Sequence, residues 1–228
     1  MKKIRISLDI TMTILSIILM GGNYLFPADI VHEILGVALF VLWAVHIALN
    51  RRWYASLAQA SKLITSTNAN DRRSYSAIFR GKYNPYRIMQ IIINCCILIC
   101  TIFLMISGII LSNHVFTFLN IQGGLGFARI AHLLASHWYY LFMSLHIGMH
   151  VGRLFQNVTA KIIPRIILAL VCAYGVYAFI ARGVWKYLIL RQQFFFFDME
   201  RGYILFAIDY ISIIILFATL SHLLAKKM

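Results

Sequence analysis

Long apolar segments constrain this chain more than any other feature of its sequence. A transmembrane helix needs about 20 residues, and six segments reach or approach that length: 8–26, 30–50, 89–111, 128–151, 162–180 and 203–224. Apolar residues make up 61% of the 228, charged residues only 12%, and the mean hydropathy is +0.81. A soluble domain has about half apolar and a quarter charged residues. We therefore predict an all-α integral membrane protein with about six transmembrane helices and no soluble domain.

Two local features refine this prediction. The basic start of the chain is followed by no small-residue cleavage site before Asn23, so we expect a retained first helix rather than a cleaved signal peptide. The fifth segment has Pro164 at its start and Gly175 inside it, which makes it the weakest helix prediction. Proline is tolerated in a first turn because no intrahelical N–H bond is lost there.

Lysine and arginine give the orientation, because they concentrate in cytoplasmic loops. Sixteen lie at the N-terminus, in the second and fourth connections and in the C-terminal tail, and five lie on the other side. We expect both termini in the cytoplasm and a multi-pass protein of the cytoplasmic membrane. The net charge of +14 is then mainly a topology signal; it belongs to loops between spans, with no nucleic-acid-binding module. The helices over 30–50 and 128–151 should run parallel.

Those two parallel segments carry matched histidine pairs. His32 and His46 are 14 residues apart, and so are His132 and His146. That spacing is close to four turns, about 21 Å of rise, and both histidines of a helix face the same way within roughly 40°. His32 and His132 should lie near the outer face, and His46 and His146 near the inner face. A neutral imidazole is a good axial ligand of haem iron, so we predict two stacked haems, each clamped by one histidine from each helix.

Other interpretations stay open for these histidines. They could serve only as hydrogen-bonding groups inside the bundle. His150, one turn beyond His146, could replace it as the inner ligand, or bind a haem propionate or a quinone; these two also have the i, i+4 spacing of a simple metal site. His137 and His150, 13 residues apart, form a rival pair of poorer helical phase. We expect His114 at the interface and His222 in a structural role.

Glycines and cysteines give weaker signals. Gly36, Gly108 and Gly148 lie near the histidines, where a missing side chain admits either a flat cofactor or a close helix. The cysteines at 95, 96, 100 and 172 all fall inside apolar segments, and no C-x-x-C-H motif is present, so covalent c-type haem is not expected. No P-loop or GxGxxG occurs. Electrons would therefore come from and go to other proteins or a membrane quinone.

Two stretches resemble the flavinylation-associated cytochrome family. HEILGVALFVLWAVHIALNRRWY, beginning at His32, looks like the first half of its domain, and AHLLASHWYYLFMSLHIGMH, ending at His150, looks like the second half. GVYAFIARGVWKYLILRQQFFFFD, residues 175–198, looks like the tail of its longer members. The resemblance implies b-type haem on His32, His46, His132 and His146, with His150 also matching the pattern. It also implies an extracytosolic flavoprotein with covalent FMN as partner. The histidine spacing is similar to that of respiratory cytochrome b.

We predict a four-helix haem-binding core over residues 1–157 and a two-helix extension over 158–228. Its expected function is transmembrane electron transfer by a b-type, di-haem cytochrome, between membrane quinol or a cytoplasmic donor and an extracytosolic flavoprotein. Quinol oxidation is the one enzymatic activity this would include. The alternatives are a histidine-based ion or proton transporter and a membrane scaffold of a flavoprotein complex. The basic 51–87 connection could bind anionic lipid or dock a donor, and the aromatic 194–203 segment could anchor at the interface, dock a partner or cover the outer haem.

Overall fold

The computed structural model describes residues 2–22, 28–53, 55, 84–197 and 202–228, and these residues form helices and loops with no strand. The 3₁₀ helix η2 spans Thr117–Leu119. The α-helices are α1 (Lys2–Met20), α2 (Asp29–Leu49), α5 (Pro85–Leu111), α6 (Leu125–His150), α7 (Gly152–Ala160), α8 (Ile162–Ala181), α9 (Val184–Leu188) and α10 (Gly202–Lys227).

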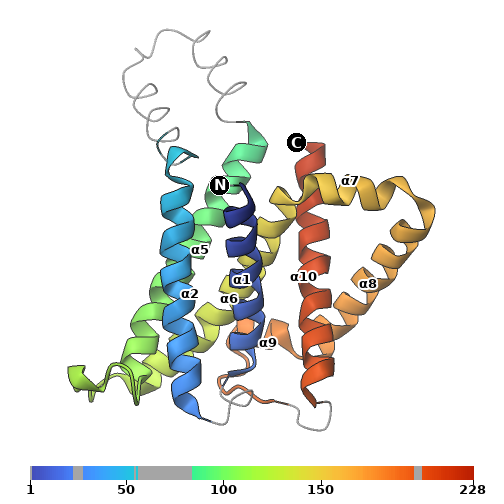
Figure 1. Cartoon of the computed structure of the whole chain (residues 1–228). Helices are drawn as coiled ribbons and strands as arrows, with labels where there is room; N and C mark the ends of the chain where they lie inside the picture. Colours follow the sequence, from blue (N-terminus) through green and yellow to red (C-terminus); the bar gives the residue numbers. More distant parts are fainter. Residues whose placement is uncertain (1, 23–27, 54, 56–83, 198–201) are drawn as a thin grey trace, which may run out of the picture.

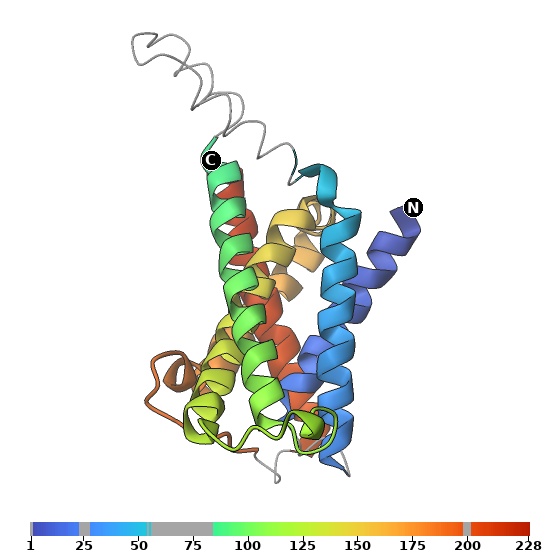
Figure 2. The same cartoon turned by 90° about the vertical axis from the view of Figure 1, so that its left-hand side faces the viewer.

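Six long helices, α1, α2, α5, α6, α8 and α10, run alternately up and down in Figures 1 and 2. Both termini and α7 lie at the upper end of Figure 1, and η2 and α9 at the lower end. Consequently α2 and α6 both run from the lower end to the upper end, so the predicted parallel direction of the two histidine-bearing helices is confirmed. These two ends are called upper and lower below.

Four of the described helices, α2, α5, α8 and α10, are long and apolar enough to cross a membrane. Their length matches the hydrocarbon thickness of a bilayer, which indicates a membrane protein. The weakest prediction, the fifth segment, is an unbroken helix from Ile162 to Ala181 with Pro164 in its first turn. Helix α6 matches the predicted segment 128–151, whereas α1 begins and ends six residues earlier than the predicted segment 8–26, whose last residues lie outside the described part. Neither is among these four helices: α1 opens with basic residues, and α6 carries four histidines.

Local chemistry explains where several helices begin. Asn84 caps α5 by accepting a hydrogen bond from the Arg87 amide at 2.9 Å, and Pro85 occupies the first helical position, where it costs no hydrogen bond. Gly124 before α6 has φ +78°, and Gly183 between α8 and α9 has φ +63°, backbone geometry that glycine adopts without a Cβ clash.

Helix α10 packs closely against both α6 and α8. Tyr140 and Tyr210 are almost fully buried there, with ring centroids 5.3 Å apart. A Cβ on Gly148 would lie 2.1 Å from the carbonyl oxygen of Ala218, and one on Gly175 would lie 2.5 Å from that of Ser212. Because only glycine allows such an approach, α10 is locked between α6 and α8. The predicted boundary at residue 157 falls within α7, beside this packed region.

Helix α2 is attached differently. It has no buried residue along its whole length, although it is strongly apolar. At its upper end the Arg5 guanidinium donates to the Leu49 carbonyl at 2.8 Å. At its lower end Glu33 accepts hydrogen bonds from the loop that follows α5. Packing against α1 and polar contacts at its two ends therefore hold α2 in place, while one side of it lines a cavity.

Candidate functional site

The histidines form two pairs at two levels of the bundle. The rings of His32 and His132 have centroids 6.4 Å apart and planes 59° apart. At the other level the His46 and His146 centroids are 6.3 Å apart, with planes at 72°. Each pair joins α2 to α6, as the 14-residue spacing on parallel helices predicts. We call these the lower pair (His32 and His132) and the upper pair (His46 and His146).

The spacing within each pair fits a metal centre bound from both sides. A metal–imidazole bond is about 2.0 Å long, and a ring nitrogen lies roughly 1.1 Å from the centroid of its five-membered ring. Two bonds and two ring radii give about 6.2 Å between centroids. Both pairs match this value closely. Direct hydrogen bonding or stacking between the rings would instead bring the centroids nearer together.

Polar side chains contact the Nδ1 atoms of the upper-pair histidines. The Nδ1 atom of His46 lies 2.8 Å from the Asp9 carboxylate, and that of His146 lies 2.8 Å from the Asn94 side-chain oxygen. Both partners accept, so each Nδ1 carries its proton and each Nε2 is left with a lone pair. Protein groups commonly orient metal-bound histidines in this way.

Ser107 does the same for His132. Its hydroxyl donates to the Phe103 carbonyl at 2.5 Å, and its oxygen lies 2.9 Å from His132 Nδ1. A hydroxyl has one proton to give, so Ser107 accepts from the Nδ1–H of His132. The Nε2 of His132 is then the atom able to bind a metal.

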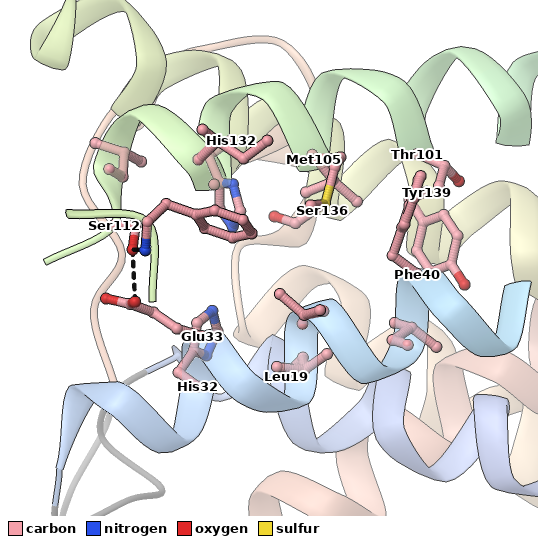
Figure 3. A pocket seen from close by; sticks show the side chains of 18 of the residues that line it. Leu19, His32, Glu33, Phe40, Thr101, Met105, Ser112, His132, Ser136 and Tyr139 are labelled. Carbon is pink, nitrogen blue, oxygen red and sulfur yellow. Dashed lines mark hydrogen bonds between the residues drawn. The ribbon is translucent and has the colours of Figure 1, made fainter. Parts of the chain in front are cut away.

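A cavity of about 310 Å³ opens beside the lower pair. Figure 3 shows His32 and His132 on opposite sides of it, with α5 and α6 contributing Met105, Ser136 and Tyr139 to its walls. Its size and largely apolar lining are those of a small-molecule site. The lining includes Gly36 and Gly108 and reaches as far as Trp43 on α2.

The two lining glycines are free of close protein contacts that would explain them. A Cβ on Gly36 would meet nothing within 4 Å, and one on Gly108 would meet only the His132 ring, at 3.7 Å. Gly148 contrasts with them, because it packs against the α10 backbone. Helix packing therefore explains Gly148. Gly36 and Gly108 instead leave open space along the cavity wall.

Glu33 closes the lower end of the cavity. Its carboxylate accepts from the Ser112 hydroxyl at 2.7 Å and from the amides of Asn113 at 2.9 Å and Val115 at 2.8 Å. Figure 3 draws the first of these contacts beside His32. Charge-assisted hydrogen bonds of this kind are the stronger ones, so Glu33 fixes α2 to the end of α5 next to the lower pair.

The remaining histidines lie in different surroundings. His150 is 4.5 Å from His146 between centroids, so both inner candidates lie at the upper level. His137 is 1% exposed; its Nδ1–H donates to the Leu133 carbonyl at 2.8 Å, and its ring stacks on Tyr187 of α9 with centroids 4.3 Å apart. His222 stacks on Phe155 of α7 at 4.9 Å.

Within the described ranges, no group of three or more His, Cys, Asp or Glu side chains could hold a metal ion. The cysteines there are all free thiols. A porphyrin supplies four ligands of its own, so two histidines are enough for a haem but too few for a structural zinc site, which takes four protein ligands. The donor set fits haem better than a simple ion.

Sequence reasoning missed Asp9, Asn94 and Ser107. Each is a polar residue within an apolar segment, and polar groups there usually serve a function. That signal could have found them, but their partners depend on how α1 and α5 are rotated. Parts of the basic 51–87 connection and of the 194–203 segment lie outside the described residues.

No family model, curated protein or solved structure matches this chain.

Proposed function

We propose that this chain is a six-span, b-type cytochrome that carries electrons across the cytoplasmic membrane. The observation that carries the proposal is the pair of parallel helices with histidines 6.4 Å and 6.3 Å apart at two levels. The upper end, with the termini and α7, is the cytoplasmic side, in keeping with the lysine and arginine bias. The lower end then faces an extracytosolic flavoprotein, as the family resemblance implies.

The residues have separate tasks in this proposal. His32 and His132 hold the outer haem, and His46 and His146 hold the inner one. Haem, when bound, supplies reversible one-electron chemistry at its iron. Ser107, Asn94 and Asp9 orient the rings through Nδ1, and the apolar cavity wall excludes water. The protein thereby positions the haems and sets their potentials; the donor is membrane quinol or a cytoplasmic protein.

The spectrum of purified protein tests the proposal. We expect a red preparation whose Soret and α bands sharpen on dithionite reduction, and a pyridine haemochrome assay giving about two haems b per chain, as bis-histidine ligation implies. A colourless preparation made with ample haem supply would overturn the proposal. It would favour the transporter or scaffold alternatives.

Single substitutions assign the ligands. His132→Ala or His32→Ala should remove one haem, and His46→Ala or His146→Ala the other. His222→Ala is the matched control, because that ring packs on Phe155 and should leave both haems bound. If His146→Ala keeps both haems and His150→Ala loses one, His150 is the inner ligand.

A further inference from the structure

We infer that Asp9 is a tuning residue that lowers the reduction potential of the upper haem by acting through His46. This inference rests on the proposed function, since it concerns a haem bound by the upper pair. The two haems would then differ in reduction potential, although the histidines of the two pairs are spaced alike.

The Nδ1 partners of the candidate ligands differ in charge. His46 faces a carboxylate at 2.8 Å, whereas His146 faces the neutral amide of Asn94 and His132 the neutral hydroxyl of Ser107. Among the described carboxylates, Glu33 and Asp29 lie near enough to His32 to act on it through charge, and Asp209 pairs with Arg182. Asp9 differs from them in bonding directly to the Nδ1 of a candidate ligand, His46.

Helix α1 holds Asp9 in this position. One turn earlier, Arg5 donates to the Leu49 carbonyl at the end of α2. One turn later, the Thr13 hydroxyl donates to the main-chain carbonyl of Asp9 at 2.8 Å, a bond within α1 that does not involve the carboxylate. The Arg5 contact therefore keeps the carboxylate beside His46, so the pairing is part of the α1–α2 association.

A carboxylate that accepts the Nδ1 proton makes the imidazole a more basic ligand. A more basic ligand favours Fe(III) over Fe(II), which lowers the reduction potential. The Asp9 side chain is 52% exposed and that of His46 25%, so water screens part of the charge. We therefore expect a change of about tenfold in the relative affinity for the two oxidation states, which is about 59 mV for one electron.

Potentiometric titration of the full-length, haem-loaded protein tests this. His46→Ala first identifies which midpoint belongs to the upper haem. Asp9→Asn keeps an acceptor oxygen at the same place but removes the charge, so the upper midpoint should rise by about 59 mV while the lower midpoint stays unchanged. Asp9→Glu should retain the low value, and Thr13→Ala, one turn away, should leave both midpoints unchanged.

Asn94→Asp provides an independent arm. It places a carboxylate on His146, so the upper midpoint should fall. If Asp9→Asn loses the upper haem, Asn94→Asp decides the question. A lowered upper midpoint in Asn94→Asp supports the inference, and an unchanged upper midpoint overturns it. Two bound haems whose midpoints do not move in Asp9→Asn would overturn the role of Asp9 and leave the cytochrome proposal intact. Absence of haem from the unmodified protein would instead overturn that proposal.

Discussion

Helices α2 and α10 have nearly the same apolar character but very different surroundings. Both are apolar enough to cross a membrane, yet α2 has no buried residue and α10 has eight. Helix α10 is locked by backbone contacts at Gly148 and Gly175. Helix α2 borders a cavity and is held by polar contacts at its ends. Apolarity alone therefore does not tell how deeply a helix is buried in the protein.

The difference divides the bundle into a packed region around α6, α8 and α10 and an open region between α2, α5 and α6. In the proposed cytochrome, the packed region fixes α6 and hence one histidine of each pair. The open region accepts the cofactor, which supplies the packing that α2 lacks. Changes in the two regions should therefore affect different properties, stability in the packed region and cofactor binding in the open one.

The largest effect should come from the buried ion pair of the packed region. Arg182 Nε lies 2.7 Å from Asp209 Oδ2, with side-chain exposures of 8% and 1%, and the Tyr174 hydroxyl donates to Asp209 at 2.5 Å. Asp209→Asn leaves a buried guanidinium uncompensated, so the free energy of unfolding should fall by about 3–5 kcal/mol. Denaturant titration in detergent measures it.

The control for this prediction removes both charges. Asp209→Leu combined with Arg182→Met should recover much of the loss, because an apolar replacement of a whole pair is often neutral. A loss below about 1 kcal/mol in the single variant, the size expected of an exposed pair, would contradict the buried character of this contact.

Haem binding should affect amide hydrogen exchange differently in the two regions. At free haem 100-fold above its dissociation constant, binding stabilises the site by about 2.7 kcal/mol. Loading should therefore slow amide hydrogen exchange in α2 and leave α10 unchanged. Mass spectrometry of peptides from the two helices, with and without haem, measures this. An exchange rate in α2 that haem loading leaves unchanged would show that α2 does not depend on the cofactor.

A matched pair of glycine substitutions compares the regions directly. Gly148→Ala places a methyl group 2.1 Å from the Ala218 carbonyl oxygen, whereas Gly36→Ala meets nothing within 4 Å. Overpacking should cost about 1–3 kcal/mol at Gly148, and Gly36→Ala should leave haem-free stability unchanged or slightly raised. Thermal unfolding of the haem-free variants gives both values. Equal costs at both positions would remove the distinction between the two regions.

The sequence predicts the helices and the histidine pairing well, because both are set by local periodicity and by charge in the connections. Residues 30–50 and 162–180 became α2 and α8 to within one residue at either end. The pairing of His32 with His132 follows from direction and spacing. Asp9, Asn94 and Ser107 could not be assigned to ligands, since that requires the rotation of α1 and α5 about their axes.

The same limit applies to the glycines and to the upper ligand. Gly36 and Gly148 each follow a histidine closely within an apolar segment. Their roles differ only because α10 packs against Gly148 and not against Gly36. His146 and His150 are one turn apart, so sequence left both open as the partner of His46. In the structure the ring centroids of His146 and His46 are 6.3 Å apart, and His150 lies beside His146. Substitution of His146 and of His150 decides which one is the ligand.

The smallest effect should come from Glu33, which fixes the open region at its lower end. A glutamine keeps one acceptor oxygen, but its NH₂ group cannot accept from Ser112, Asn113 or Val115. Glu33→Gln should therefore lower the free energy of unfolding by only about 1 kcal/mol. Its effect should be local: faster amide exchange at 113–115 and weaker binding of the lower haem, by about fivefold if the full 1 kcal/mol opposes binding.

Asp29→Asn, which removes the same charge one turn away on α2, is the control and should leave exchange at 113–115 unchanged. Faster exchange confined to the upper end of α2 would contradict the assigned position of this contact. Unchanged haem affinity would show that the cavity keeps its shape without it.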